Sequence, residues 1–143
     1  MSQAFRKVLS PNDANETGGH QAGILIPKHM EELIKFLGGL DSSIKNPREK
    51  LPFIDEDGVT NNFNFIYYNN KFHSPQGTRN EYRLTGMTAY LRRCNAQSGD
   101  ELELLRLDGE GYFRVSLIKE KSQESDQAGT SNRIKLRGWR SLH

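Results

Sequence analysis

Residues 78–84, Thr-Arg-Asn-Glu-Tyr-Arg-Leu, carry charged and uncharged side chains at alternate positions. In an extended strand, successive side chains point to opposite faces, so Arg79, Glu81 and Arg83 share one face. The uncharged residues of the stretch share the other face. If the segment is extended, the Arg-Glu-Arg row therefore lies on one face of a strand and the uncharged residues lie on the other.

The Arg-Glu-Arg row suits the recognition of base edges in a major groove. Same-face residues of a strand lie roughly 6.6 Å apart, close to two base-pair steps of about 3.4 Å. An arginine fork fits O6 and N7 of guanine, and a carboxylate accepts from N4 of cytosine. On spacing alone the row is a candidate for such contacts, with Arg83 on guanine, Glu81 on cytosine and Arg79 on a base or a phosphate. The alternative is a solvated strand face with ion pairs worth about 0.2–1 kcal/mol each.

Length and composition indicate one domain over residues 1–143, because the chain has 143 residues of which 34% are hydrophobic. The formal net charge of +2 is mild and neither requires nor excludes a nucleic-acid partner. The single cysteine, Cys94, excludes an internal disulfide and fits a reducing compartment. No apolar run is long enough to span a membrane and no signal core follows Met1, so we expect a cytoplasmic protein without a membrane partner.

The apolar patterns predict mostly short strands. Strands are expected at residues 4–9, 22–26, 62–69, 101–107, 112–118 and 134–139, and short helices at 29–37 and 87–94. Residues 41–58 read as a polar surface excursion with room for one short strand, and residues 119–131 as a solvent loop or a locally disordered segment. This arrangement is typical of a small barrel or an open twisted sheet.

Two polar loops stand out by their length and turn-forming residues, and each leads into an apolar strand. Together with the flanking strands they read LSPNDANETGGHQAGILIP at 9–27 and IYYNNKFHSPQGTRNEYRLTG at 66–86. These two stretches closely resemble the N-terminal effector-binding domain of EcoRII-type restriction endonucleases. That domain is similar in fold to the B-three DNA-binding domain of plant transcription factors.

The resemblance implies a mainly β (α+β) fold with short helices, a DNA-binding pseudobarrel of about seven strands. Two arms are expected to close around the major groove of double-stranded DNA: an N-arm at about residues 10–21 and a C-arm at about residues 71–83. The implied function is sequence-specific recognition of a short site, as the effector or targeting module of a restriction endonuclease in the prokaryotic cytoplasm.

The resemblance also carries over to individual residues. The family's histidine after the double glycine falls on His20, and the C-arm arginine, glutamate and second arginine fall on the Arg-Glu-Arg row. Two family lysines are replaced here by Gly77 and Tyr82, which weakens phosphate anchoring at those points. Asn80 is expected either to pair with adenine or to brace the loop.

Motif and spacing together give a set of expected DNA contacts. They are Lys7, Asn12, Asp13, Gly19, His20, Gln21, Lys71, Arg79, Asn80, Glu81, Tyr82 and Arg83. Further candidate phosphate contacts are Arg92, Arg93, Lys135, Arg137 and Arg140.

No catalytic motif is evident in the sequence. The four histidines show no metal-ligand spacing with one another or with Cys94. We therefore expect no cofactor for binding, and Mg²⁺ only in a nuclease domain or subunit outside this chain. Two alternatives remain open: a β-barrel module that binds single-stranded nucleic acid or protein without sequence specificity, and a small hydrolase using Asp55, Asp57 and Glu81.

Overall fold

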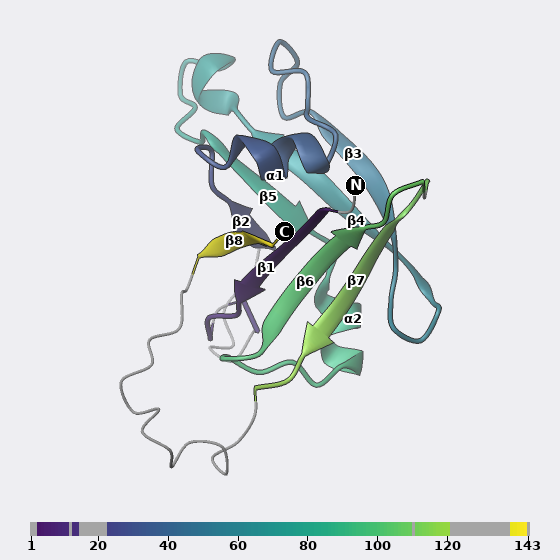
Figure 1. The fold of residues 1–143 in the computed structure, drawn as a ribbon. Coiled ribbons are helices and arrows are strands. Elements are labelled where there is room, and N and C mark those ends of the chain that lie inside the picture. Colours follow the sequence, from purple (N-terminus) through teal and green to yellow (C-terminus); the bar gives the residue numbers. More distant parts are fainter. Residues whose placement is uncertain (1–2, 12, 15–22, 110, 121–137, 143) are drawn as a thin grey trace.

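The computed structural model describes residues 3–11, 13–14, 23–109, 111–120 and 138–142 (Figure 1). They form an eight-stranded sheet in the order β2-β5-β4-β3-β7-β6-β1-β8. The strands are β1 Gln3–Val8, β2 Ile24–Ile26, β3 Arg48–Ile54, β4 Thr60–Tyr68, β5 Glu81–Thr85, β6 Glu101–Arg106, β7 Phe113–Ile118 and β8 Trp139–Leu142. The helices are α1 Glu31–Phe36, α2 Thr88–Arg93 and the short 3₁₀ helix η1 Asn70–Phe72.

The sheet curls until its two outer strands meet. The indole Nε1 of Trp139 on β8 donates a hydrogen bond of 2.9 Å to the carbonyl oxygen of Leu25 on β2. All neighbouring strands run antiparallel except β3 and β7, which are parallel and pair only through Phe53↔Phe113 and Ile54↔Arg114. The result is a nearly closed barrel, which confirms the predicted mainly β pseudobarrel with short helices.

The sheet has one strand more than the expected number of about seven. Strand β3 forms in the stretch expected to be largely a surface excursion. It pairs with β4 over its whole length and turns Leu51 and Phe53 into the core, at 8% and 0% exposure. Its first three residues are charged or polar and exposed, which hides the strand pattern in the sequence.

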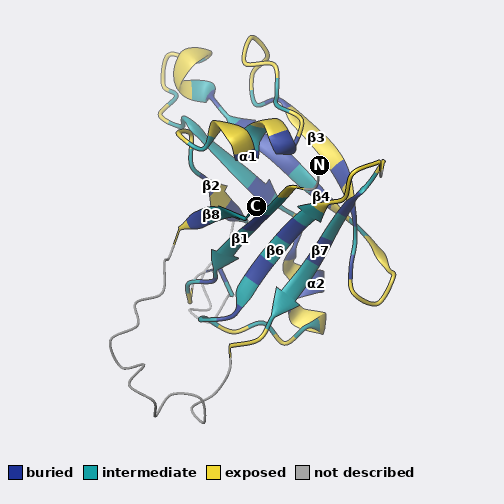
Figure 2. Ribbon diagram, viewed as in Figure 1, coloured by how far each residue is buried: buried dark blue, intermediate teal, exposed yellow. Residues whose placement is uncertain are grey.

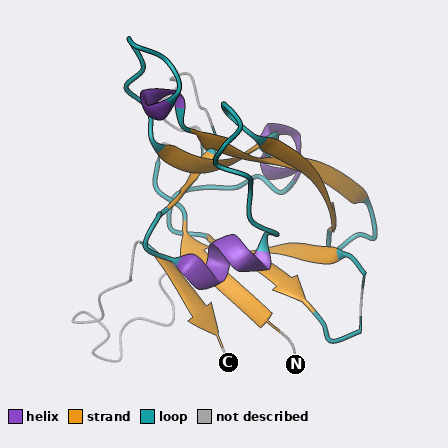
Figure 3. Cartoon of the chain, turned by 90° about the horizontal axis from the view of Figure 1, so that it is seen from above, coloured by secondary structure: helices purple, strands orange, loops and turns teal. Residues whose placement is uncertain are grey.

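Aromatic side chains fill the barrel. Phe53 stacks on Phe63 and on Phe113, with ring centroids 5.0 and 4.8 Å apart. Phe36 of α1 contacts Phe5 of β1 and Phe113, so α1 packs its apolar face into the same core. Figure 2 shows the buried residues on the strands and on the inner faces of the helices. Seen from above, the strands form two layers and the short helices lie apart from one another (Figure 3).

The remaining strand and helix predictions hold within a few residues, except at the C-terminus. The last strand was expected at 134–139, but β8 begins at Trp139, where that prediction ends. Residues 134–137 lie outside the described part of the chain, as do residues 121–131 of the expected solvent loop. Trp139, the first residue of β8, is buried at 7% exposure and belongs to the core.

Candidate nucleic-acid interface

The Arg-Glu-Arg row lies on one face of the chain at the start of β5, as its alternation predicts. Both arginines bind the same carboxylate oxygen: Nη2 of Arg79 lies 2.6 Å and Nε of Arg83 lies 2.7 Å from Oε2 of Glu81. The hydrogen bond from Arg79, followed by that from Arg83, lowers the pKa of Glu81 below its ordinary value. Glu81 is therefore ionised at neutral pH and holds two guanidinium groups side by side.

A second contact fixes Arg83 against the edge strand β2. Its Nη1 donates to the carbonyl oxygen of Gly23 at 3.1 Å, and Arg83 is in register with Leu25. Gly23 has φ +86°, and a Cβ there would lie 2.3 Å from the carbonyl oxygen of Leu84. A residue with a side chain therefore does not fit at position 23 without moving the backbone that holds Arg83.

Arg79 is held by an aromatic ring and by the backbone of the C-arm. Its guanidinium carbon lies 3.9 Å from the ring centroid of Tyr68 on β4, a cation–π contact. The backbone N–H of Arg79 donates to Oδ1 of Asn70 at 2.9 Å, and the backbone carbonyl of Arg79 accepts from Lys71 N at 3.0 Å. These backbone contacts explain why β5 begins at Glu81, although the sequence predicts an extended segment from Thr78.

The C-arm is a closed loop rather than a loose excursion. Ser74 N donates to the Asn70 carbonyl and Gly77 N donates to the Ser74 carbonyl, each at 3.0 Å. At Gly77 the chain passes so close to η1 that a Cβ would lie 2.0 Å from the Asn70 carbonyl oxygen. Glycine at this position therefore permits a tight loop between η1 and the Arg-Glu-Arg row.

The base of the C-arm is tied to the loop before β3. Asn69 is 1% exposed and exchanges two hydrogen bonds with Asn46, one in each direction. Its amide nitrogen also donates to the carbonyls of Ser42 and Ile44. The sequence prediction missed this junction, for which the only signal is an asparagine in each of two turn-rich segments.

The other predicted C-arm residues have different surroundings. Asn80 accepts a 2.7 Å hydrogen bond from the hydroxyl of Tyr67, which agrees with its expected bracing role. Tyr82 stacks on Tyr67 across strands, with centroids 4.2 Å apart and planes 6° from parallel. Burial, and then the neighbouring Tyr67, raises the pKa of Tyr82. Lys71 is exposed on η1.

At the base of the N-arm, Asp13 is buried at 8% exposure and organises the turn. Its Oδ2 accepts from Lys7 Nζ and from Ser10 N, while Asp13 N donates to the Ser10 hydroxyl. The side chain of Lys7 is 12% exposed and paired with Asp13. Both predicted residues thus have structural partners here. The other N-arm predictions, Asn12, Gly19, His20 and Gln21, lie outside the described residues.

Of the additional phosphate candidates, Arg92 is exposed on α2, Arg93 binds Asp55 and Arg140 binds Glu101. Lys135 and Arg137 are not among the described residues.

For the hydrolase alternative, Asp55 accepts from the N–H groups of Asp57 and Val59 as part of the β3–β4 turn. Burial opposes ionisation of Asp55, but the hydrogen bonds from Asn61 and these neighbours lower its pKa.

In the parts of the chain that the structure describes, no three His, Cys, Asp or Glu side chains are grouped to hold a metal ion, and no helix is long and apolar enough to cross a membrane.

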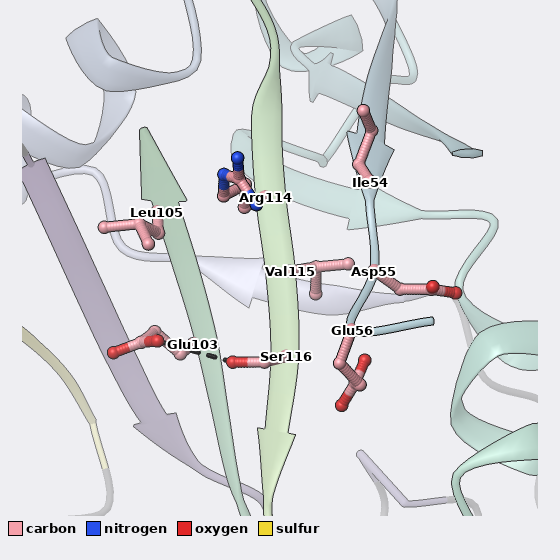
Figure 4. A pocket seen from close by; sticks show the side chains of 8 residues that line it. All are labelled: Ile54, Asp55, Glu56, Glu103, Leu105, Arg114, Val115 and Ser116. Carbon is pink, nitrogen blue, oxygen red and sulfur yellow. Dashed lines mark hydrogen bonds between the residues drawn. The ribbon is translucent and has the colours of Figure 1, made fainter. Parts of the chain in front are cut away.

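A separate pocket of about 130 Å³ lies where β3 and β7 diverge (Figure 4). Its carboxylates are already bound by protein groups: Glu103 accepts from Arg6 and Ser116, and Glu56 from Tyr90 and Leu117 N. None of the predicted DNA-contact residues lines it. The Arg-Glu-Arg row with the C-arm is therefore the stronger candidate site.

Comparison with known proteins identifies the family of the chain. The family model described as "Restriction endonuclease EcoRII, N-terminal" matches residues 2–102, which include both arms and the Arg-Glu-Arg row. Comparison with the curated proteins found no match. Since the family model covers well over half of the 143 residues, the chain belongs to the family of EcoRII restriction endonuclease N-terminal domains.

Proposed function

We propose that this chain is a sequence-specific double-stranded DNA-binding domain that reads a short site in the major groove. The observation that carries the proposal is the Arg-Glu-Arg row, in which one carboxylate oxygen holds two guanidinium groups on the same face. The family supports it, because a restriction endonuclease must locate a defined DNA sequence.

The free hydrogen-bonding groups of the row match the edges of a G·C pair. Arg83 has five N–H donors, and its contacts with Glu81 and Gly23 leave donors on Nη1 and Nη2 for O6 and N7 of guanine. Both arginine contacts of Glu81 fall on Oε2, and no donor among the described residues reaches Oε1. Oε1 can therefore accept from N4 of cytosine while Oε2 keeps the arginines in place.

The two arms supply the rest of the interface. The C-arm is held rigidly by Asn69 and Asn70 and carries the exposed Lys71 beside the row. In the N-arm, His20, Gly19, Gln21 and Asn12 remain proposed DNA contacts by their place in the family motif. Lys7 and Asp13 are proposed to act by holding the base of that arm, since they bind one another.

We further propose that the domain serves as an effector or targeting module of a restriction endonuclease in the prokaryotic cytoplasm. Cleavage would belong to a nuclease domain or subunit outside this chain, and Mg²⁺ would be needed there and not for DNA binding. The hydrolase alternative is not favoured, because Asp55 is held in the β3–β4 turn by Val59 N and Asn61, and Oε2 of Glu81 is bound by both arginines.

The second alternative, a non-specific module for single strands, needs exposed aromatic rings on which bases stack. Tyr67 and Tyr82 instead stack on one another, and Tyr68 is covered by the guanidinium of Arg79. Phe72 is the one large exposed aromatic among the described residues. Double-stranded DNA is therefore the better partner.

Selection from a pool of randomised DNA duplexes, followed by sequencing, tests the proposal. The wild-type chain should enrich one short site containing a G·C pair, without added Mg²⁺, and single-stranded competitor should not displace it. Enrichment of no site, or displacement by single strands as readily as by the duplex, would reject the proposal in favour of a generic binding barrel.

A further inference from the structure

The sheet face that carries Arg83 continues across β4, where Ile66 is buried at 3% exposure, onto β3. Leu25, Arg83, Ile66 and Arg48 follow one another in register on β2, β5, β4 and β3. Thr85, Asn64 and Lys50 form the next such row. Because directly paired residues of neighbouring strands point to the same face, Arg48 and Lys50 share the face of Arg83.

Arg48 and Lys50 differ from the cations of this protein that are held in ion pairs. Both are exposed, and in the part of the chain that the structure describes no carboxylate or carbonyl pairs with either side chain. Arg6, Lys7, Arg79, Arg83, Arg93, Lys119 and Arg140 all have carboxylate partners. Two free positive charges therefore stand on the same sheet face as the proposed base-reading row.

Their spacing fits the backbone of a duplex whose groove is read by β5. Two strand spacings of about 4.8 Å separate β5 from β3, roughly 10 Å in all. The major groove is about 12 Å wide, so a side chain that far to the side of the reading strand meets the phosphates that line the groove. Along β3, Arg48 and Lys50 are about 6.6 Å apart, which allows each to meet a different phosphate of one strand.

We propose that Arg48 and Lys50 of β3 form a phosphate-binding track beside the base-reading row, which extends the DNA interface beyond the two arms. This inference rests on the proposed function for its ligand, double-stranded DNA. The track contacts only the sugar–phosphate backbone, so it contributes affinity and orientation without sequence information.

The test measures how the DNA dissociation constant of the double variant Arg48→Ala/Lys50→Ala depends on salt. Each lost phosphate contact reduces the magnitude of the slope of log K against log salt concentration by about 0.9. The slope of the double variant should therefore be smaller in magnitude than that of wild type by about 2. Selection from randomised duplexes should return the wild-type site. The charge-conserving variant Arg48→Lys/Lys50→Arg should keep the wild-type slope, and Lys35→Ala, exposed on α1, serves as a control for loss of charge elsewhere.

The two proposals fail in different ways. If the wild type selects one site but the double variant keeps the full salt slope, the phosphate track is wrong and the proposed function stands. If the wild type selects no site but the double variant still loses slope, the track stands as a non-specific DNA contact and the proposed function is wrong. Thermal melting shows that each variant is folded, which both exposed positions should permit.

Discussion

In the proposed readout, Glu81 has two tasks that use different oxygens of one carboxylate. Oε2 binds both arginines and fixes the direction of their guanidinium groups, while Oε1 is proposed to accept from a DNA base. Preorganisation of this kind lowers the entropy lost when side chains are ordered on binding. Ion pairs within the row were the mark of the alternative, a solvated strand face. Because they use only Oε2 of Glu81, they are also compatible with base recognition.

The lowered pKa of Glu81 gives a test at the residue scale. A carboxyl group whose pKa is lower in the folded state stabilises the fold above its unfolded pKa, and this contribution is lost as the pH falls through the folded pKa. Wild type should therefore be more stable than Glu81→Gln at pH 7, and the difference should shrink below about pH 4.5. Urea unfolding of both proteins across this range measures the difference. A difference that stays constant down to pH 2 would contradict the ion-pair account.

At the scale of elements, the C-arm depends on a close approach of two backbone segments. Gly77 lies against the carbonyl of Asn70, and Asn70 in turn holds the N–H of Arg79. A change at Gly77 should therefore reach the Arg-Glu-Arg row through Asn70, although no side chain of the row is altered.

Gly77→Ala should weaken specific DNA binding by about tenfold or more, equivalent to losing one contact of about 1.4 kcal/mol. The barrel should remain folded, since the C-arm lies outside its core. Gly111→Ala is the matched control, because a Cβ there meets nothing within 4 Å. Fluorescence anisotropy on the selected duplex gives both affinities, and equal affinities for the two variants would count against a rigid C-arm.

Elements with a strong alternation of apolar side chains were predictable from the sequence. The predictions that missed an element did so for identifiable physical reasons. Strand β4 was predicted, and its alternating aromatics Phe63, Phe65 and Tyr67 are all buried. Strand β3 is obscured because its first three residues are exposed and Pro52 interrupts it. A proline is tolerated there since β3 pairs along its full length only with β4.

The site, too, was predictable only where the local sequence carries a strong pattern. The shared face of Arg79, Glu81 and Arg83 follows from the period of a strand and is confirmed. The partners that orient these residues, Gly23 and Tyr68, come from other strands, and local sequence does not show which residues pair across a sheet. The DNA contacts themselves remain predictions.

For the whole molecule, closure of the barrel depends on Trp139, which joins the outer strands β8 and β2. Leu25, whose carbonyl accepts the indole N–H, is in register with Arg83. This contact between β8 and β2, the seam that completes the barrel, thus also supports β2, against which Arg83 is held.

Trp139→Phe should lower the free energy of unfolding by about 1 kcal/mol, the usual value of one hydrogen bond. Trp139→Ala should lower it by about 3–5 kcal/mol, because it also leaves a cavity in the core. Urea denaturation measures both. Loss of less than about 1 kcal/mol in the alanine variant would mean that the seam contributes little to the barrel.

The most direct test of the central claim couples Arg83 to one base pair. Dissociation constants are measured for wild type and Arg83→Ala on the selected duplex and on duplexes with each base pair replaced in turn. Replacing the guanine that Arg83 reads should weaken wild-type binding by about 1–3 kcal/mol but should have little further effect on the variant. The variant should still discriminate at the other positions. If Arg83→Ala keeps the wild-type profile at every position, Arg83 reads no base and the proposed readout is wrong.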